Sequence, residues 1–232
     1  MAGPGRGQAL VAVTPTVDAP SVLLTYDDGP DPESTPTVLR ELAAADALAT
    51  FFVLGTRVKL YPDVLRSVAE EGHEIGLHGA DHRRVDQIPA AELARALVES
   101  KDMLEQAVQR PVVWYRPPYG ALTSSAWTAV DEAGMTTAGW TCELRDWLDL
   151  PREEQVAGVE TISRAGEIIL AHDSFADARD LVDDGPAPPI DRGLLTRAVL
   201  DRISSDDCRR PTISEAVARG APVWQQWVAD AG

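Results

Sequence analysis

The sequence predicts an α/β fold in which parallel strands form a barrel and helices pack around its outside. From residue 21 onward, short runs rich in β-branched and aromatic residues alternate with helical patterns. Strict alternation of this kind favours parallel strands joined by helical crossovers, and the number of units suits a barrel better than a short open sheet. In such a fold, functional side chains gather just after the carboxyl ends of the strands.

The strands and helices can be placed along the chain in order. The strand candidates are short, apolar and bounded by turn residues or helical patterns, and they lie at 21–26, 49–55, 73–78, 112–115, 135–142 and 167–170. The helix candidates between and after them lie at 35–46, 61–72, 89–110, 124–134, 151–166 and 191–204. In the longest of these, Leu93, Leu97 and Leu104 lie close to one stripe at helical period. A short strand and helix are expected near 211–220.

The composition is that of one globular domain. The chain has 232 residues, of which 44% are hydrophobic, and a formal net charge of -16. This charge argues against nucleic acid and against anionic membranes as partners. Residues 1–20 contain only a five-residue apolar run, which is too short for a signal-peptide core or a membrane span. We therefore expect an N-terminal extension over 1–20, a catalytic domain over 21–232, and a cytoplasmic protein unless a leader has been lost.

Two adjacent carboxylates, Asp27 and Asp28, stand at the end of the first predicted strand, in the stretch TYDDGP. Adjacent residues on a continuing strand point to opposite faces, so the pair could not share one site if the strand went on. Gly29 and Pro30 break the strand immediately afterwards, which lets both carboxylates converge. Like charges this close repel each other unless a cation or an arginine relieves them.

Two histidines, His78 and His82, follow another predicted strand in the stretch GLHGADH. Their separation places both imidazoles on the same side of a helical turn, where they can hold one metal ion. Alone, such a pair is more often a solvated helix face. Together with Asp28 it offers two nitrogens and one oxygen with further positions open, which is typical of a catalytic rather than a structural metal site.

Three more polar residues follow predicted strands. His172 is a candidate general acid or base, although a satisfied core histidine is the plainer interpretation of that residue alone. Arg116, in the rigid turn YRPPYG, could pair with one of the aspartates, and Asp146, in LRDWLD, could orient His172. His73 begins a predicted strand directly after a helix-ending glycine, and we expect it to be buried and structural.

Taken in order, the stretches TYDDGP, HGADH, RPPYG, RDW and ILAHD resemble the five motifs of the polysaccharide deacetylases, carbohydrate esterase family four. This family includes the chitin, peptidoglycan and nodulation-oligosaccharide deacetylases. The resemblance runs from about residue 21 to near the end of the chain. It implies a distorted (β/α) barrel and metal-dependent hydrolysis of an N-acetyl group.

The resemblance also implies roles for individual residues. The metal ligands would be Asp28, His78 and His82. Asp27 would be the general base, kept ionised and oriented by Arg116. His172 would be the general acid, with Asp146 holding its imidazolium form. The metal is one divalent ion, with Zn²⁺ as the first choice and Co²⁺, Ni²⁺, Mn²⁺ or Fe²⁺ as alternatives that the same ligands fit.

For substrate binding, the resemblance implies that the backbone N–H of Tyr119 faces the developing oxyanion and that Trp147 and Leu170 wall the pocket for the acetyl methyl group. The chain departs from the family in the second motif. Gly79 stands where a hydroxyl residue is usual, and Leu77 stands in place of a polar residue. We expect these two changes to affect the rigidity of the metal loop and local substrate contacts, with the metal ligands intact.

Three functions are open at this point. The leading hypothesis is a metal-dependent N-deacetylase that acts on an N-acetylated amino sugar, in a short glycan or a glycosylated metabolite. A second is hydrolysis of another amide, imide or formamide, because the chemistry does not depend on a sugar. A third is a catalytically inactive sugar-binding protein, against which the intact acidic and histidine residues argue. The expected partner is a small carbohydrate or amide, without nucleic acid or membrane.

The stretch 174–191 is rich in Asp and Pro and is expected to form a long ordered loop at the mouth of the site. It carries Asp177, Asp180, Asp183 and Asp184 close together, with only Arg179 among them to offset their charge. One hypothesis is that this acidic rim attracts a positively charged substrate. The plainer interpretation is that the carboxylates only solubilise the surface.

Overall fold

The strands form one curled, mixed sheet in the order β6-β5-β4-β3-β2-β8-β1-β9, with β7 paired to β8. The computed structural model describes residues 3–15, 21–160, 165–203 and 208–228. The strands are β1 (Gln8–Pro15), β2 (Ser21–Asp27), β3 (Ala49–Leu54), β4 (Glu74–Gly79), β5 (Trp114–Tyr115), β6 (Thr136–Thr137), β7 (Cys142–Glu143), β8 (Ala165–His172) and β9 (Gly220–Gln226).

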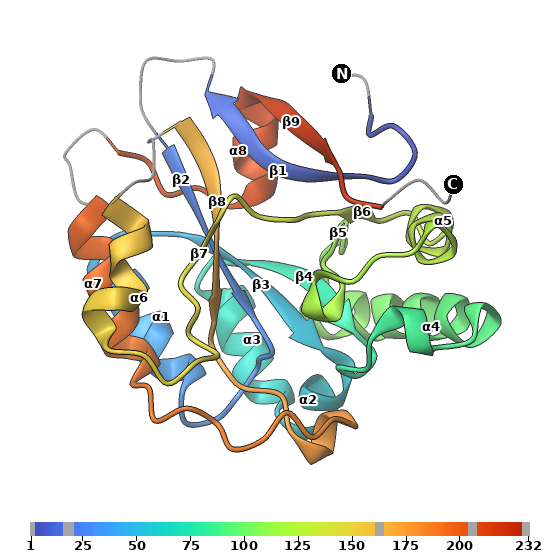
Figure 1. Ribbon diagram of the computed structural model, residues 1–232, viewed down its shortest axis with the longest axis horizontal. Coiled ribbons are helices and arrows are strands. Elements are labelled where there is room, and N and C mark those ends of the chain that lie inside the picture. Colours follow the sequence, from blue (N-terminus) through green and yellow to red (C-terminus); the bar gives the residue numbers. More distant parts are fainter. Residues whose placement is uncertain (1–2, 16–20, 161–164, 204–207, 229–232) are drawn as a thin grey trace.

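Helices surround this sheet, as the alternating sequence predicts. They are α1 (Thr35–Ala44), α2 (Gly55–Leu60), α3 (Pro62–Glu70), α4 (Ala90–Val108), α5 (Ser124–Glu132), α6 (Arg152–Glu160), α7 (Arg192–Ile203) and α8 (Ile213–Arg219). Figure 1 shows α1, α6 and α7 grouped on one flank and α4 and α5 on the other. Within the described segments, no helix combines the length and the apolar character needed to cross a lipid bilayer.

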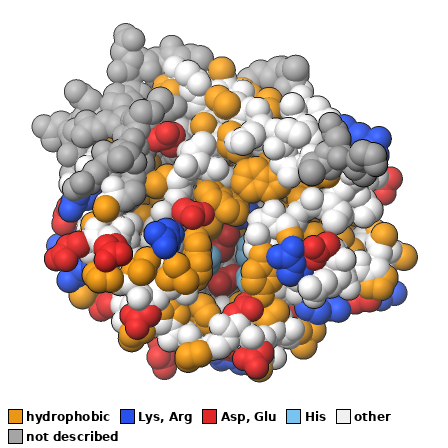
Figure 2. Space-filling view, in the orientation of Figure 1, with side chains coloured by type: hydrophobic (Ala, Val, Ile, Leu, Met, Phe, Trp, Pro, Cys, Tyr) orange, Lys and Arg blue, Asp and Glu red, His pale blue; other side chains and the backbone are white. Residues whose placement is uncertain are grey.

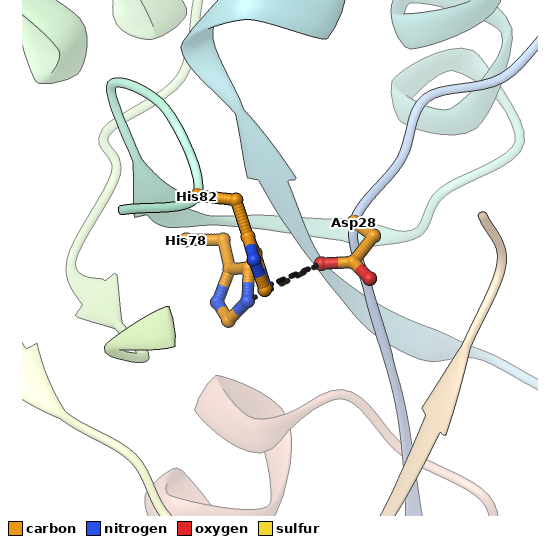
Figure 3. Close-up of side chains that lie close together, drawn as sticks. All are labelled: Asp28, His78 and His82. Atoms are coloured by element: carbon orange, nitrogen blue, oxygen red, sulfur yellow. Dashed lines mark ion pairs between the residues drawn. The ribbon is translucent and has the colours of Figure 1, made fainter. Parts of the chain in front are cut away.

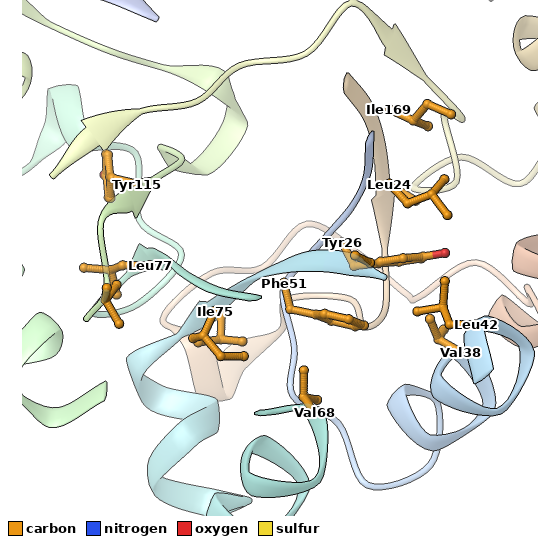
Figure 4. Close-up of a cluster of buried hydrophobic side chains, with 14 of the residues drawn as sticks. Leu24, Tyr26, Val38, Leu42, Phe51, Val68, Ile75, Leu77, Tyr115 and Ile169 are labelled. Carbon is orange, nitrogen blue, oxygen red and sulfur yellow. The ribbon is translucent and has the colours of Figure 1, made fainter. Parts of the chain in front are cut away.

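The core lies between the inner strands and the helices. Every residue of β2 and β3 is buried, which explains why both read as continuous apolar runs rather than alternating ones. Tyr26 and Phe51 stack with their ring centroids 5.1 Å apart, and Figure 4 shows them beside Val38 and Leu42 of α1 and Val68 of α3. Each such side chain contributes about 1.5–3 kcal/mol when it leaves water. This packing fixes the strands whose ends carry the site.

The first strand differs most from expectation. Residues 8–15, which the sequence assigns to an extension, form β1, antiparallel to both β8 and β9. A further bridge joins Leu10 to Ala138, so the curled sheet returns to β1 after β6. The apolar run Ala9–Val13, too short for a membrane span, is thus long enough for a buried strand. Residues 1–2 and 16–20 lie outside the described chain, and the division at residue 20 stays a prediction.

The barrel class is confirmed, with three local differences. The strand expected over 135–142 is two short strands, β6 and β7, which pair with β5 and β8 respectively. The short helix α2, directly after β3, was not predicted, and the short strand expected with a helix near 211–220 lies after α8, as the antiparallel strand β9. The helices expected over 151–166 and 191–204 extend into residues 161–164 and 204, which lie outside the described chain.

Candidate active site

The two adjacent aspartates turn toward one pocket at the carboxyl end of β2. Asp27 is the last residue of the strand, and Asp28 adopts φ +75°, a left-handed conformation that Asp tolerates better than most residues. The chain is closely packed here, because a Cβ on Gly29 would collide with the carboxylate of Asp173. Both carboxylates are buried and line the same pocket. The backbone therefore changes direction at Asp28 itself, one residue earlier than the Gly-Pro sequence suggests.

Asp28, His78 and His82 form a compact cluster of potential metal ligands (Figure 3). Asp28 Oδ1 lies 3.4 Å from His78 Nε2 and 3.2 Å from His82 Nε2, and the three ligand atoms are all within 4.8 Å of one another. All three residues are buried. Asp28 Oδ1 accepts no hydrogen bond from any described residue. A buried, unpartnered carboxylate oxygen beside two imidazole nitrogens fits a divalent cation.

The spacing of the two histidines arises from a strand end and a bend, not from the helical turn that the sequence suggests. His78 lies in β4, and His82 follows in an irregular bend. Gly79 has φ +152°, and a Cβ there would meet Asp81 O at 2.5 Å, so a side chain at this position would be strained. Glycine in place of the family's hydroxyl residue therefore permits the turn that brings the two imidazoles together.

Electrostatics around the cluster favours an ionised Asp28. Burial by itself opposes ionisation, but His82 and His78 hold the pKa of Asp28 well below its usual value. The other nitrogen of His78, Nδ1, lies 2.9 Å from Arg116 O, which leaves Nε2 directed at Asp28. The ring of His78 is thus oriented by the backbone.

Arg116 is completely buried and held from several sides. Its Nη1 donates to Asp27 Oδ1 at 2.8 Å and to Thr25 Oγ1 at 2.7 Å. Its Nε and Nη2 donate to the carbonyl oxygens of Ala138 and Gly139, at 3.3 and 2.9 Å. Sequence reasoning left open which aspartate this arginine would meet until the family resemblance assigned it to Asp27. The contact with Asp27 is present, and Thr25 was not anticipated.

His172 and Asp146 meet across the pocket from the metal cluster. Nδ1 of His172 lies 2.7 Å from Asp146 Oδ1, and the backbone N–H of His172 donates to Asp146 Oδ2 at 2.8 Å. Although burial disfavours the imidazolium, the neighbouring Asp146 carboxylate raises the pKa of His172 to about 9. Asp146, which is also buried, has its pKa lowered by His172 and by a third residue, Arg192.

Arg192, the first residue of α7, is a contributor that the sequence did not reveal. Its Nη1 donates to Asp146 Oδ2 at 3.1 Å and to His172 O at 2.8 Å. The side chain is nearly buried. No motif marks it, and its only sequence signal is a basic residue at the start of the helix that follows the long loop.

The pocket between the metal cluster and His172 has a volume of about 460 Å³. Trp147 and Leu170 both line it, and Trp147 packs edge-on against His172 with ring centroids 5.5 Å apart. Tyr119 has φ +58°, and its ring lies 4.5 Å from the ring of His82. In Figure 2, carboxylate and imidazole groups lie at the bottom of a hollow framed by hydrophobic side chains. Of the ten predicted site residues, all but Arg116 and Asp146 therefore line one cavity, and these two pair with the lining residues Asp27 and His172.

His73 lies away from the pocket, whereas the loop over residues 174–191 borders it. His73 is buried and accepts the N–H of Ala49, away from the pocket, as expected of a structural residue. The loop after β8 does border the site, because Phe175, Ala176 and Asp184 line the pocket.

The acidic rim, however, is not the row of unpaired carboxylates that the sequence suggests. Asp180 is fully buried and pairs with Arg57 of α2, at 2.7 Å from Nη2. Arg57 also contacts Asp177 at 3.1 Å, and Asp177 pairs with Arg179 as well. Arg57 lies more than a hundred residues away in the sequence, so the charges within the loop sequence did not reveal this pairing. Two of the four aspartates are thus paired with arginines, so the rim carries less uncompensated negative charge than the sequence suggests, and its attraction for a cationic substrate stays a prediction.

Comparisons with known proteins agree with this geometry. The sequence model of the family described as polysaccharide deacetylase matches residues 14–138. The chain is 35% identical over 163 residues to a peptidoglycan-N-acetylglucosamine deacetylase of Bacillus cereus, covering 69% of this chain and 76% of that protein. It is 35% identical over 160 residues to a chitooligosaccharide deacetylase of Azorhizobium caulinodans, covering 68% and 76%.

A solved structure is similar over most of the chain. It is the family 4 acetyl xylan esterase of Clostridium thermocellum in complex with a cobalt ion, with a TM-score of 0.72 and 25% sequence identity. The match covers 85% of this chain and 90% of that one. A match of this extent reaches beyond residue 138, where the family match ends.

Proposed function

The chain belongs to the polysaccharide deacetylase family, and from that premise we propose that it is a metal-dependent hydrolase that removes the N-acetyl group from an N-acetylated amino sugar. The substrate would be a short glycan or a glycosylated metabolite. The observation that carries the proposal is the buried Asp28–His78–His82 cluster, which faces the His172–Asp146 pair across one pocket. Amide hydrolysis needs an activated water and a proton for the leaving nitrogen, and these two groups are suited to the two tasks.

The metal would be held by Asp28, His78 and His82, with Zn²⁺ as the first choice and Co²⁺, Ni²⁺, Mn²⁺ or Fe²⁺ as alternatives. A divalent cation bound there would polarise the acetyl carbonyl and lower the pKa of a water molecule. Three protein ligands leave room for both water and substrate, which a structural site with four protein ligands does not.

Asp27 would take the proton from the attacking water. Its Oδ1 is occupied by Arg116, and its Oδ2 lies on the side of His78, 3.9 Å from Nδ1. Arg116 is fixed by two carbonyl oxygens and by Thr25, so it cannot follow a movement of the carboxylate without losing those bonds. The arginine thereby holds the orientation of the Asp27 carboxylate.

His172 would give a proton to the leaving amine. A pKa of about 9 keeps the ring protonated at neutral pH, which a general acid requires. Asp146 binds Nδ1, so the proton to be transferred is on Nε2. Arg192 holds Asp146 from the other side, at 3.1 Å.

The substrate's acetyl group would lie between these two sides. Trp147 and Leu170 offer an apolar wall for the methyl group, and both line the pocket. The backbone N–H of Tyr119 would donate to the oxyanion that develops on the carbonyl. Removing one such donor typically costs about 10²–10³-fold in turnover.

The proposal is tested by acetate release from N-acetylglucosamine oligosaccharides, measured before and after removal of metal with a chelator and after its return. We expect release that disappears with the metal and recovers with it. Parallel assays with simple acetamides, imides and formamides address the second hypothesis. Activity confined to those compounds would show that the substrate is not an amino sugar. Sugar binding without any hydrolysis would identify an inactive binding protein.

A further inference from the structure

The two histidines of the metal cluster differ in how their outer nitrogens are supported. His78 Nδ1 lies 2.9 Å from the carbonyl oxygen of Arg116. His82 Nδ1 is buried and has no hydrogen-bond partner among the described residues. A histidine that binds a metal through Nε2 carries its proton on Nδ1, and that N–H almost always has an acceptor. The acceptor for His82 is therefore the missing part of this centre.

A carboxylate stands nearest to that nitrogen. Asp184 Oδ2 lies 3.9 Å from His82 Nδ1, which is too far for a hydrogen bond, and among the described residues no other charged group forms an ion pair with that atom. The same oxygen accepts the hydroxyl of Tyr119 at 2.6 Å, and the ring of Tyr119 packs against the ring of His82. Asp184 also lines the pocket. It is thus held beside His82 by a residue that itself contacts His82.

The loop that carries Asp184 is fixed to the rest of the site by a buried anchor. Arg57 is 0% exposed and donates to both carboxylate oxygens of Asp180, at 2.9 Å or less for Oδ2. Thr56 adds a hydrogen bond to Asp180 Oδ1 at 2.6 Å. The carbonyl oxygen of Asp180 then accepts the backbone N–H of His82 at 3.0 Å.

Arg57 connects this loop to the other metal-binding segment as well. Its Nη1 contacts Asp31, three residues after the ligand Asp28, at 3.4 Å, and its Nη2 donates to Phe175 O at 2.9 Å. One buried guanidinium therefore joins the turn after β2, helix α2 and the loop after β8. A buried arginine with this many acceptors is costly to leave unpaired, which favours a single loop position.

We propose that Asp184 is a positioning residue of the metal centre. It accepts the Nδ1–H of His82 when the metal is bound, and the Arg57–Asp180 ion pair holds its loop in place. The proposal rests on the proposed function, because it takes the ion at Asp28, His78 and His82 as given. In this arrangement each ligating imidazole is oriented from behind, His78 by a backbone carbonyl and His82 by a carboxylate.

The sequence supplies a matched control for the test. Asp183, next to Asp184, is exposed and does not line the pocket, so Asp183→Ala removes the same charge from the same loop. Metal-free wild type, Asp184→Ala, Asp184→Asn and Asp183→Ala are titrated with Zn²⁺ by calorimetry and with Co²⁺ by visible absorption. We expect Asp184→Ala to bind about 10- to 100-fold more weakly, with an altered Co²⁺ spectrum.

Asp183→Ala should bind as the wild type does, and Asp184→Asn should keep part of the affinity because its amide oxygen can still accept the N–H. Equal affinities and spectra for Asp184→Ala and Asp183→Ala would overturn the positioning role while leaving the proposed function intact. Failure of the wild type to bind either metal would instead contradict the proposed function.

The anchor is tested separately by the double variant Arg57→Met/Asp180→Leu, which removes both buried charges together and so leaves neither unpaired. We expect it to fold, as judged by circular dichroism, and to bind Zn²⁺ more weakly than wild type. Adding Asp184→Ala to it should weaken binding by less than the same change does in the wild type, because the loop is already released. Full additivity of the two losses would show that the ion pair does not act through Asp184.

Discussion

The two sides of the pocket differ in how completely their polar atoms are satisfied. On the acid side, Asp146 accepts hydrogen bonds from His172 and from Arg192, all at 3.1 Å or less. On the metal side, Asp28 Oδ1 and His82 Nδ1 are buried without a hydrogen-bond partner among the described residues. An unsatisfied buried polar group costs about 1–3 kcal/mol. Asp146 on the acid side is therefore satisfied by protein atoms alone, whereas on the metal side Asp28 Oδ1 needs a cation and His82 Nδ1 needs the acceptor that we propose to be Asp184.

The largest effects should come from removing a ligand on the metal side. Asp28→Ala, His78→Ala or His82→Ala should each lower metal content and abolish acetate release, because two remaining ligands hold the ion poorly. Metal content is measured by elemental analysis after dialysis, with Arg66→Ala, an exposed residue of α3, as the control. If both histidine variants kept their metal in full, the ligand assignment would be wrong.

The next effect separates metal binding from catalysis. Asp27→Asn should retain the metal and lose turnover, because asparagine cannot take a proton although it can still accept a hydrogen bond from Arg116. Metal content and acetate release are measured on the same preparation. Loss of the metal in this variant would show that Asp27 is a metal ligand. Normal turnover would show that Asp27 is not the general base.

A smaller effect is expected on the acid side. His172→Ala should leave metal content unchanged and lower turnover by roughly 10²- to 10⁴-fold, the usual contribution of a general acid. The comparison with the ligand variants is direct, because only they should change the metal content. A near-normal rate would show that His172 is a structural residue and not the general acid.

The smallest expected effect concerns the pKa of His172 on the acid side of the pocket. The imidazolium of His172 is stabilised by Asp146, so its ring in the metal-free protein should titrate near pH 9 rather than 6.5. Asp146→Asn removes that attraction while burial remains, and the pKa should fall. Because the acid is active when protonated, the alkaline loss of activity should then move to lower pH. NMR titration of the ring checks the shift, and an unchanged pKa in Asp146→Asn would contradict this assignment of its cause.

Much of the site could be predicted because its residues directly follow strands. Asp27, His78, Arg116 and His172 each lie at or just after a strand end, and parallel strands bring those ends together. The period of the apolar runs located the central strands and most helices. The family motifs then assigned roles that spacing alone left open, and those roles, like the cytoplasmic location, stay predictions.

What the sequence did not reveal depends on contacts between distant segments. Arg57 meets Asp180 across more than a hundred residues, and Arg192 of α7 meets Asp146 across 46 residues, so neither pair forms a local pattern. Arg57 does follow a strand end, which was an available but unused signal. The antiparallel pairing of β1 was missed because the sequence of a five-residue apolar run does not show which strands it will pair with.

The most direct test of the account is a titration of the metal-free protein with Zn²⁺ while acetate release from an N-acetylglucosamine oligosaccharide is followed. The account predicts no release without metal, a rise in proportion to bound ion, and a plateau at about one ion per chain, as three ligands around one position require. The same titration of His82→Ala should stay flat. Equal acetate release from the metal-free and the metal-loaded protein would contradict the central claim that this cluster and its ion carry the reaction.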